Sequence, residues 1–462
     1  MQRNKAFSHR LMRVVMAVFY GLTVCFASSP AVAQGIPLVR DTEVENLLKD
    51  YSRPIFKAAG LGSHISMRIV RHESFNAFVI DGLNVFMNTG TILTAKTPNE
   101  VIGVIAHETG HITGGHLAAL RSRIARDQTK ALLLMVLGIG LMVGGAASGG
   151  DAAREMGGVG TGVAMGGQDV LIRSLLSERR SQESAADQAA LKYLAVTKQS
   201  GRGMLETFER FAQQEYVSAA HQDPFVRSHP VAADRIARLR DLVAASPYAN
   251  EKDPPALQLR HDMARAKISG YLERPGTVFN RYPASDNSLP ARYARAIARN
   301  CSGRCDSNLR EVDALIRERS DNPYFWELKG NLQYWSGKHR ESIPQLRKAL
   351  QLAGGEASLM QTQLGQAMLA TEDKGMLDGA IGLLRRSIAT DKGHGPSHLS
   401  LATAYYRKGM LPQADLAAAQ GHFAEGNVKR AQDFAKRAIS KLPAGSPGWL
   451  QADDIVKYKK PS

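Results

Sequence analysis

Cysteine is scarce in this chain, which has only three among its 462 residues. A structural zinc site built from thiolates alone needs more of them, so that class of site is excluded. Cys25 lies in the apolar N-terminal stretch, which leaves Cys301 and Cys305 three residues apart. In an oxidising compartment these two can close a small disulfide loop, and the alternative is that both stay reduced. We predict the disulfide.

The N-terminus has the features of a cleaved secretion signal. Four basic residues precede a short apolar run over 14–27: Arg3, Lys5, Arg10 and Arg13. Ala31-Val32-Ala33 then fits an A-x-A cleavage site, so we expect a signal peptide over 1–33 and an exported mature protein. An uncleaved membrane anchor is the alternative. Lipoprotein processing at Cys25 is disfavoured, because Val24 is bulky where such sites need a small residue.

Acidic residues are also few relative to basic ones. Lys and Arg number 59 against 43 Asp and Glu, a net charge of +16 that falls to +12 when the four basic residues of the signal are removed. A basic surface can favour anionic membrane headgroups or nucleic acid. An exported protein rarely meets nucleic acid, so no nucleic-acid partner is expected. A simply solvated basic surface remains the plainer interpretation.

The strongest chemical signal is His107-Glu108-Thr109-Gly110-His111, an H-E-x-x-H sequence. Thr97, Pro98 and Glu100 are typical of a helix start with a capping box, so these residues belong to one helix. Residues four apart share a helix face, and His107 and His111 can therefore hold one Zn²⁺. Glu108 can then act as the general base toward water. Chance would give such a sequence only about 0.02 times in a chain like this one.

His116 is not expected to bind the metal. Metzincins place a third ligand six residues after the second His, and here that position is Leu117. His116 lies nine residues after His107, about 180° away on a continuous helix. It could approach the site only if Gly114-Gly115 bends the chain sharply.

A second helical pattern over 169–198 offers a third ligand. Glu183 and Asp187 are four residues apart and share a face, with small residues between them that permit close packing on the first helix. A downstream helical Glu completes the His₂Glu zinc site of gluzincins, and Asp187 can hydrogen bond to a ligand His. Glu178 and Asp169 remain competitors for the ligand role.

Ser228-His229-Pro230 lies in a loop before another helix, and a His in such a loop can swing. His229 could enter the site as a fourth ligand or stabilise the oxyanion, or it could be an ordinary exposed or capping residue. Arg235, one turn into the following helix, can pair with a carboxylate of the site.

Two apolar runs, 74–80 and 83–88, flank Asp81-Gly82 and predict a β-hairpin. Its free edge can pair with an extended substrate peptide, or it can be purely structural. The uncharged segment 131–150 is long enough for a membrane span. It can also be a membrane-touching element over the active site, or a buried segment of the protein.

Together, His107 to His111, Glu183 to Asp187 and Ser228-His229-Pro230 with Arg235 resemble the zinc metallopeptidases of the HtpX and CAAX-prenyl-protease type. Asn76-Ala77 on the predicted hairpin also fits that pattern as the substrate strand. The resemblance implies zinc bound by His107, His111 and Glu183, with Glu108 as base. In periplasmic members the His of the S-H-P loop can cap the zinc and keep the enzyme latent, and His229 matches it.

Beyond a linker over 247–256 the sequence is helical and repetitive. Four glycines, each followed five residues later by a small residue, are spaced by 38, 34 and 17: Gly337, Gly375, Gly409 and Gly426. Thirty-four is the tetratricopeptide period, and such repeats stack into a superhelix that binds extended protein segments. We therefore predict a mainly α fold with a small β-sheet, in which a gluzincin-type metalloprotease domain over 34–246 precedes a tetratricopeptide-repeat solenoid over 257–462.

Two functions are compatible with these features. The first is a zinc endopeptidase to which the repeats bring a substrate or partner. The resemblance implies a periplasmic location, misassembled outer-membrane proteins as substrates and the barrel-assembly machinery as partner. The second is a chaperone or assembly scaffold with a latent metal site, although the intact Glu108 favours proteolysis.

Overall fold

The structure is a computed structural model that describes residues 36–459, apart from 63, 81, 127–164, 213–223, 300–305 and 356. Four sequence features therefore lie outside the described residues: the predicted signal peptide over 1–33, the apolar segment 131–150, Cys301 and Cys305. Among the residues that are described, no helix is both long and apolar enough to cross a membrane.

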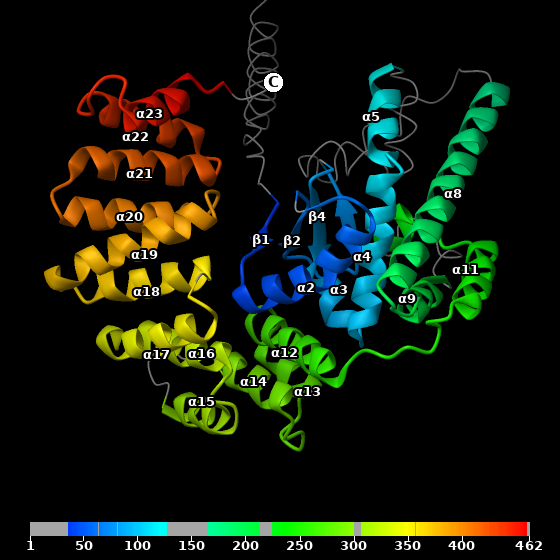
Figure 1. Cartoon of the computed structure of the whole chain (residues 1–462), viewed down its shortest axis with the longest axis horizontal. Coiled ribbons are helices and arrows are strands. Elements are labelled where there is room, and N and C mark those ends of the chain that lie inside the picture. Colours follow the sequence, from blue (N-terminus) through cyan, green and yellow to red (C-terminus); the bar gives the residue numbers. More distant parts are fainter. Residues whose placement is uncertain are drawn as a thin grey trace, which may run out of the picture.

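A four-stranded sheet lies at the centre of the N-terminal half (Figure 1). Its order is β1-β2-β4-β3, with β2 and β4 parallel and the other neighbours antiparallel. The strands are β1 (Leu38–Val39), β2 (Ser66–Val70), β3 (Ala77–Val79) and β4 (Asn84–Asn88). The predicted hairpin is confirmed as β3 and β4, joined through Gly82 at φ 75°, a conformation that favours glycine. No described strand covers the outer edge of β3.

Helices of the N-terminal half pack on this sheet and on one another. They are α2 (Thr42–Ala58), α3 (Thr89–Thr94), α4 (Pro98–Thr113), α5 (His116–Arg126), α8 (Met165–Val196), α9 (Arg202–Ala212), α10 (Pro224–Ser228) and α11 (Ala233–Ala245). Because side chains alternate along a strand, Ala77, Val85 and Met87 are buried in the core shared with α2 and α4. Phe78 and Phe86 stack on the opposite face, with ring centroids 5.4 Å apart.

Helix α4 begins where the sequence predicts, with Thr97 as its N-cap and Pro98 as its first residue. Thr97 Oγ1 accepts a hydrogen bond from the Glu100 N–H at 3.3 Å. The predicted capping box is wrong in its second half, because the Glu100 carboxylate accepts from the Lys96 N–H at 3.1 Å instead of from Thr97. The other oxygen of Glu100 pairs with Arg210 at 2.6 Å, which ties α4 to α9.

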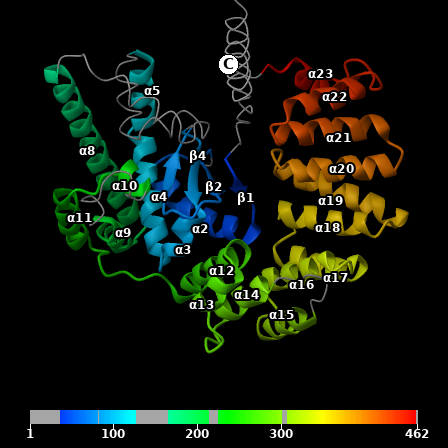
Figure 2. The same cartoon turned by 180° about the vertical axis from the view of Figure 1, so that it is seen from behind.

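The C-terminal half is a stack of helix pairs that rises beside β1, on the side of the sheet away from α8 (Figures 1 and 2). Its helices are α12 (Pro255–Leu272), α13 (Pro275–Arg281), α14 (Leu289–Ala298), α15 (Asp306–Glu318), α16 (Pro323–Trp335), α17 (His339–Leu352), α18 (Ser358–Ala370), α19 (Leu377–Thr390), α20 (Gly395–Arg407), α21 (Leu411–Ala424), α22 (Val428–Ile439) and α23 (Pro447–Lys457). The predicted fold class is confirmed.

The small residues that define the repeat are all buried between helices: Ser342, Ala380, Ala414 and Ala431. Gly337, Gly409 and Gly426 have positive φ in the turns before their helices. Gly375 lies instead in a 3₁₀ turn over Lys374–Met376, where Glu372 takes the positive φ of 59°.

Helix α12 joins the two halves. On one side, His261 contacts the Tyr51 hydroxyl and the Ala95 carbonyl oxygen, each at 3.1 Å. On the other, the buried Lys267 Nζ lies 2.9 Å from Asp41 and 3.0 Å from Glu327, and so bridges the start of α2 to α16. The start of α2 is thereby fixed against the helical stack.

Candidate metal centre

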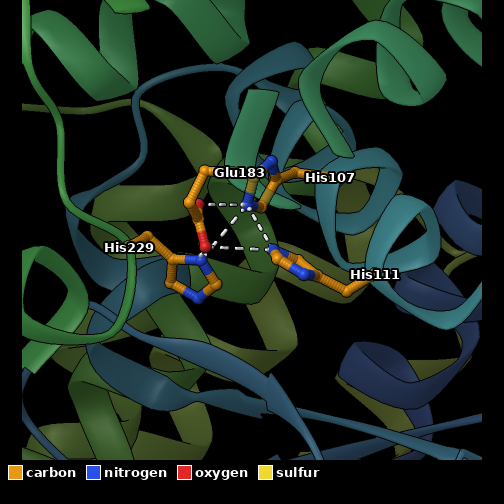
Figure 3. A group of neighbouring side chains, drawn as sticks. All are labelled: His107, His111, Glu183 and His229. Carbon is orange, nitrogen blue, oxygen red and sulfur yellow. Dashed lines mark hydrogen bonds and ion pairs between the residues drawn. The ribbon is translucent and has the colours of Figure 1, made fainter. Parts of the chain in front are cut away.

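Four potential metal ligands from three separate segments meet in the N-terminal half (Figure 3). Helix α4 supplies His107 and His111, α8 supplies Glu183, and the loop after α10 supplies His229. Their ligand atoms all lie within 4.8 Å of one another. His107, Glu183 and His229 are buried, and His111 is partly buried.

Five distances between these residues are close to the ligand-to-ligand distance of a tetrahedral metal site. His107 Nε2 lies 3.1 Å from His111 Nε2, 3.2 Å from His229 Nδ1 and 3.3 Å from Glu183 Oε2. Glu183 Oε2 also lies 3.2 Å from His229 Nδ1, and the other oxygen, Oε1, lies 3.4 Å from His111 Nε2. Four ligands at about 2.0–2.1 Å from a tetrahedral ion are about 3.3 Å apart.

Hydrogen bonding alone does not account for this convergence. His107 Nε2 has three polar neighbours, yet a ring nitrogen carries at most one proton. The other ring nitrogen, Nδ1, already lies 3.0 Å from Asp187 Oδ1. A cation at the centre would satisfy the converging lone pairs at once. The donor set therefore fits a metal ion.

Glu108 is buried beside this group. Its Oε1 accepts no hydrogen bond from the described residues, and it lies 3.3 Å from His229 Nε2. Burial raises the pKa of Glu108 to about 7, despite the opposing charges of His111 and His107. A carboxylate in this state can both take up and release a proton near neutral pH.

Asp187 and Arg235 support the ligands from behind. Arg235 Nε lies 2.6 Å from Asp187 Oδ2, and Arg235 Nη1 lies 3.0 Å from Glu183 Oε2. Burial acts to raise the pKa of Asp187, but Arg235 and His107 outweigh it and hold this pKa below its usual value. Burial acts to lower the pKa of His107, and hydrogen bonds with Asp187 and Glu183 raise it to about 9.

Among the described side chains, the competing carboxylate Glu178 is not part of this group. Glu178 accepts a hydrogen bond from Gln182 at 3.3 Å, and nothing is described of the Asp169 side chain. Arg179 contributes in an unexpected way, since its guanidinium donates to the Ser228 carbonyl and so secures the His229 loop to α8.

Sequence reasoning missed two further neighbours. Phe208 on α9 packs edge-on against the His107 ring at 5.4 Å and lies under the Arg235 guanidinium at 4.6 Å. Phe225 packs against His229 at 5.1 Å. Nothing in the sequence distinguishes these two from other core aromatics. His116 Nδ1 lies 2.8 Å from His111 Nδ1, which is the approach that the sequence left open if Gly114-Gly115 bends the chain.

The predicted substrate strand lies next to the site. Ser228 Oγ donates to Asn76 Oδ1 at 3.4 Å, which connects β3 to the loop that carries His229. The Asn76 carbonyl accepts from the Asn88 N–H at 2.9 Å. The main-chain carbonyl of Asn76 therefore faces β4, and by alternation along the strand the main chain of Ala77 faces the open edge.

Parts of this chain are similar to a known protein family, to named relatives and to a solved structure. Residues 40–243 match the model described as "Peptidase family M48". The chain is similar to a "Putative beta-barrel assembly-enhancing protease" of Vibrio cholerae, with 24% identity over 64% of this chain and 60% of the relative. It is also similar to the "Beta-barrel assembly-enhancing protease" of Escherichia coli K12, with 22% identity over 89% of this chain and 82% of the relative. The solved structure "MamA MSR-1 C2" matches 36% of this chain and 93% of its own at 19% identity and a TM-score of 0.30.

Proposed function

Residues 40–243 are a domain of peptidase family M48, which makes the chain a metalloprotease, and on this premise we propose that it is a zinc-dependent endopeptidase. His107, His111 and Glu183 are the proposed zinc ligands, with one zinc per chain. The observation that carries this assignment is the set of five distances between 3.1 and 3.4 Å among the converging ligand atoms. They fit the small tetrahedral site that zinc prefers.

When bound, zinc would supply Lewis acidity that polarises the scissile carbonyl and makes water more acidic. Glu108 takes the proton from the attacking water and delivers it to the leaving amine. Its buried position beside the converging ligand atoms suits both halves of this transfer. Asp187 holds His107 through Nδ1, and Arg235 fixes the Asp187 carboxylate.

The substrate is proposed to bind as an added strand on the outer edge of β3. Ala77 would make the main-chain hydrogen bonds, because its peptide groups face that edge. The main chain of Asn76 is already engaged by Asn88 and by Thr91 Oγ1 at 2.8 Å. Asn76 therefore acts through its side chain, which contacts Ser228.

His229 is proposed to hold the enzyme in a latent state. A catalytic zinc site keeps one position open, whereas a site with four protein ligands is closed. With Nδ1 of His229 at 3.2 Å from both His107 and Glu183, the fourth position is filled. Proteolysis then requires the His229 loop to move away, and Ser228 couples that loop to the substrate strand.

We place the protein in the periplasm and infer that its substrates are unfolded or stalled outer-membrane proteins. The support is the name of the relatives, "Beta-barrel assembly-enhancing protease". The helical repeats would bring substrate or the outer-membrane barrel-assembly machinery to the site. Segment 131–150 is the proposed point of peripheral membrane contact.

A second function, assembly scaffold or chaperone, is favoured by the closed geometry at His229. In that case the protein assists barrel assembly while its metal site stays latent. The two functions are compatible, because the repeats and the metal site occupy different halves of the chain.

The test combines metal analysis with proteolysis of an unfolded barrel protein. We expect Glu183→Ala to lose zinc. Glu108→Gln should keep zinc and lose roughly 10²–10⁴-fold in rate. Zinc retained at the wild-type level in Glu183→Ala would overturn the ligand assignment, and wild-type degradation by Glu108→Gln would overturn the protease. Barrel assembly supported by Glu108→Gln would establish the scaffold role.

A further inference from the structure

The two histidines on α4 have different partners on their rear nitrogens. His107 Nδ1 contacts the carboxylate of Asp187, at 3.0 Å. His111 Nδ1 contacts a second imidazole instead of a carboxylate, and it lies 2.8 Å from Nδ1 of His116. The His111 and His116 rings meet edge to face, with centroids 5.0 Å apart and planes at 76°. Both contacts lie on the side of each ring away from the converging ligand atoms.

The turn between α4 and α5 is built so that this contact can form. Gly115 has φ +64°, in the left-handed region, and ends the continuous helix that would carry His116 away. A Cβ on Gly114 would lie 2.5 Å from Nε2 of His116, so the ring rests against the glycine backbone. One glycine thus interrupts the helix, and the other leaves room for the imidazole.

The chemistry of a metal ligand sets the direction of the hydrogen bond. A neutral imidazole has one N–H and one free lone pair. Nε2 of His111 points toward His107 and Glu183, so the lone pair must be there for the residue to bind zinc. The proton is then on Nδ1, and His111 donates to His116 Nδ1, which accepts.

We propose that His116 is a positioning residue for His111. By accepting this hydrogen bond it selects the Nδ1–H tautomer of His111 and fixes the orientation of the ring. His116 does not touch the substrate or the converging ligand atoms. This inference rests on the proposed function, because it requires His111 to be a zinc ligand.

The test measures zinc affinity of the full-length protein by competition with a chromophoric chelator. We expect His116→Ala to bind zinc roughly 10–100-fold more weakly, as other partners of metal-bound His do when removed. His116→Gln should recover part of the loss, because its amide oxygen can accept, and His116→Phe should not. His339→Ala is the matched control, since His339 also begins a helix after a positive-φ glycine.

Nitrogen NMR of labelled histidine gives a second readout. In the zinc-loaded wild type, His111 should show the Nδ1–H tautomer. In His116→Ala the chemical shift of that proton should move to the value of a proton without this hydrogen bond. Gly114→Ala should weaken zinc binding in the wild type and have little further effect in His116→Ala, because both changes remove one contact. Additive losses would overturn the inference.

The outcomes separate this inference from the function on which it rests. If His111→Ala loses zinc while His116→Ala binds it within about twofold of the wild type, the positioning role is wrong and the ligand set stands. If His111→Ala binds zinc as tightly as the wild type, the ligand set itself is wrong. The zinc-free forms of His116→Ala and His339→Ala are also compared by their free energy of unfolding. This comparison shows whether a loss of zinc affinity comes from general destabilisation.

Discussion

His229 Nδ1 lies 3.2 Å from His107 Nε2, although 122 residues separate the two in the sequence. Such a distance leaves no room for a water molecule or a substrate carbonyl between them. The loop holding His229 is secured from two sides, by Arg179 at the Ser228 carbonyl and by the Ser228 hydroxyl at Asn76. The closed arrangement is therefore supported by contacts outside the ligand group.

Replacement of His229 by Ala should raise proteolytic activity. Removing the proposed fourth ligand opens the position that catalysis needs, and coupling of about 1–3 kcal/mol would give roughly 5–150-fold. The measurement is the rate of cleavage of an unfolded barrel protein at equal zinc content. Adding Glu108→Gln to the same variant should abolish the gain. Equal or lower activity in zinc-loaded His229→Ala would contradict the latent state.

Asp187→Asn should weaken zinc binding, because the carboxylate that orients His107 is replaced by a neutral amide of the same shape. The expected loss is roughly 10–100-fold in affinity, measured by chelator competition. Asp234→Asn, at an exposed position beside Arg235, is the control and should bind zinc normally. Normal affinity in Asp187→Asn would show that the hydrogen bond to His107 does not support the metal.

Gly110→Ala should destabilise the protein, even though alanine is the better helix former. A Cβ on Gly110 would lie 2.6 Å from the Ala186 carbonyl oxygen, a backbone atom that cannot turn aside. Forcing α4 and α8 apart should cost about 1–3 kcal/mol and lower the Tm. Gly276→Ala, with nothing within 4 Å, should be neutral or slightly stabilising. Similar melting of both variants would contradict close packing at Gly110.

Local patterns in the sequence were sufficient for the secondary structure around the site. The alternating residues that flank Gly82 predicted the hairpin, and Thr97 with Pro98 predicted the start of α4. The spacing of His107 and His111 placed both on one face. These features depend on neighbouring residues alone, so they can be read without knowing the tertiary fold.

Contacts that depend on a single turn or on distant packing could not be read in this way. The expectation that His116 points away from the site assumed a continuous helix, and one left-handed residue, Gly115, changed its direction. Phe208 approaches His107 because α9 packs on α4, and its sequence position gives no hint of this. Lys267 likewise finds Asp41 more than two hundred residues away, and isolated charges carry no periodic signal.

The carboxylate cluster around Lys267 should make stability depend on pH in an unusual direction. Burial raises the pKa of Glu43 to about 7, despite the nearby Lys267. A carboxyl whose pKa is raised by folding binds more protons when folded, so its contribution is present below about pH 4.5 and is lost as the pH rises through 7. Relative to the wild type, the free energy of unfolding of Glu43→Gln, which mimics the protonated form, should therefore rise by roughly 2–3 kcal/mol between pH 4.5 and pH 8.

Urea unfolding at both pH values measures this difference. Glu206→Gln, at an exposed position on α9, should show no such change, and a pH-independent offset in Glu43→Gln would rule out the proposed titration.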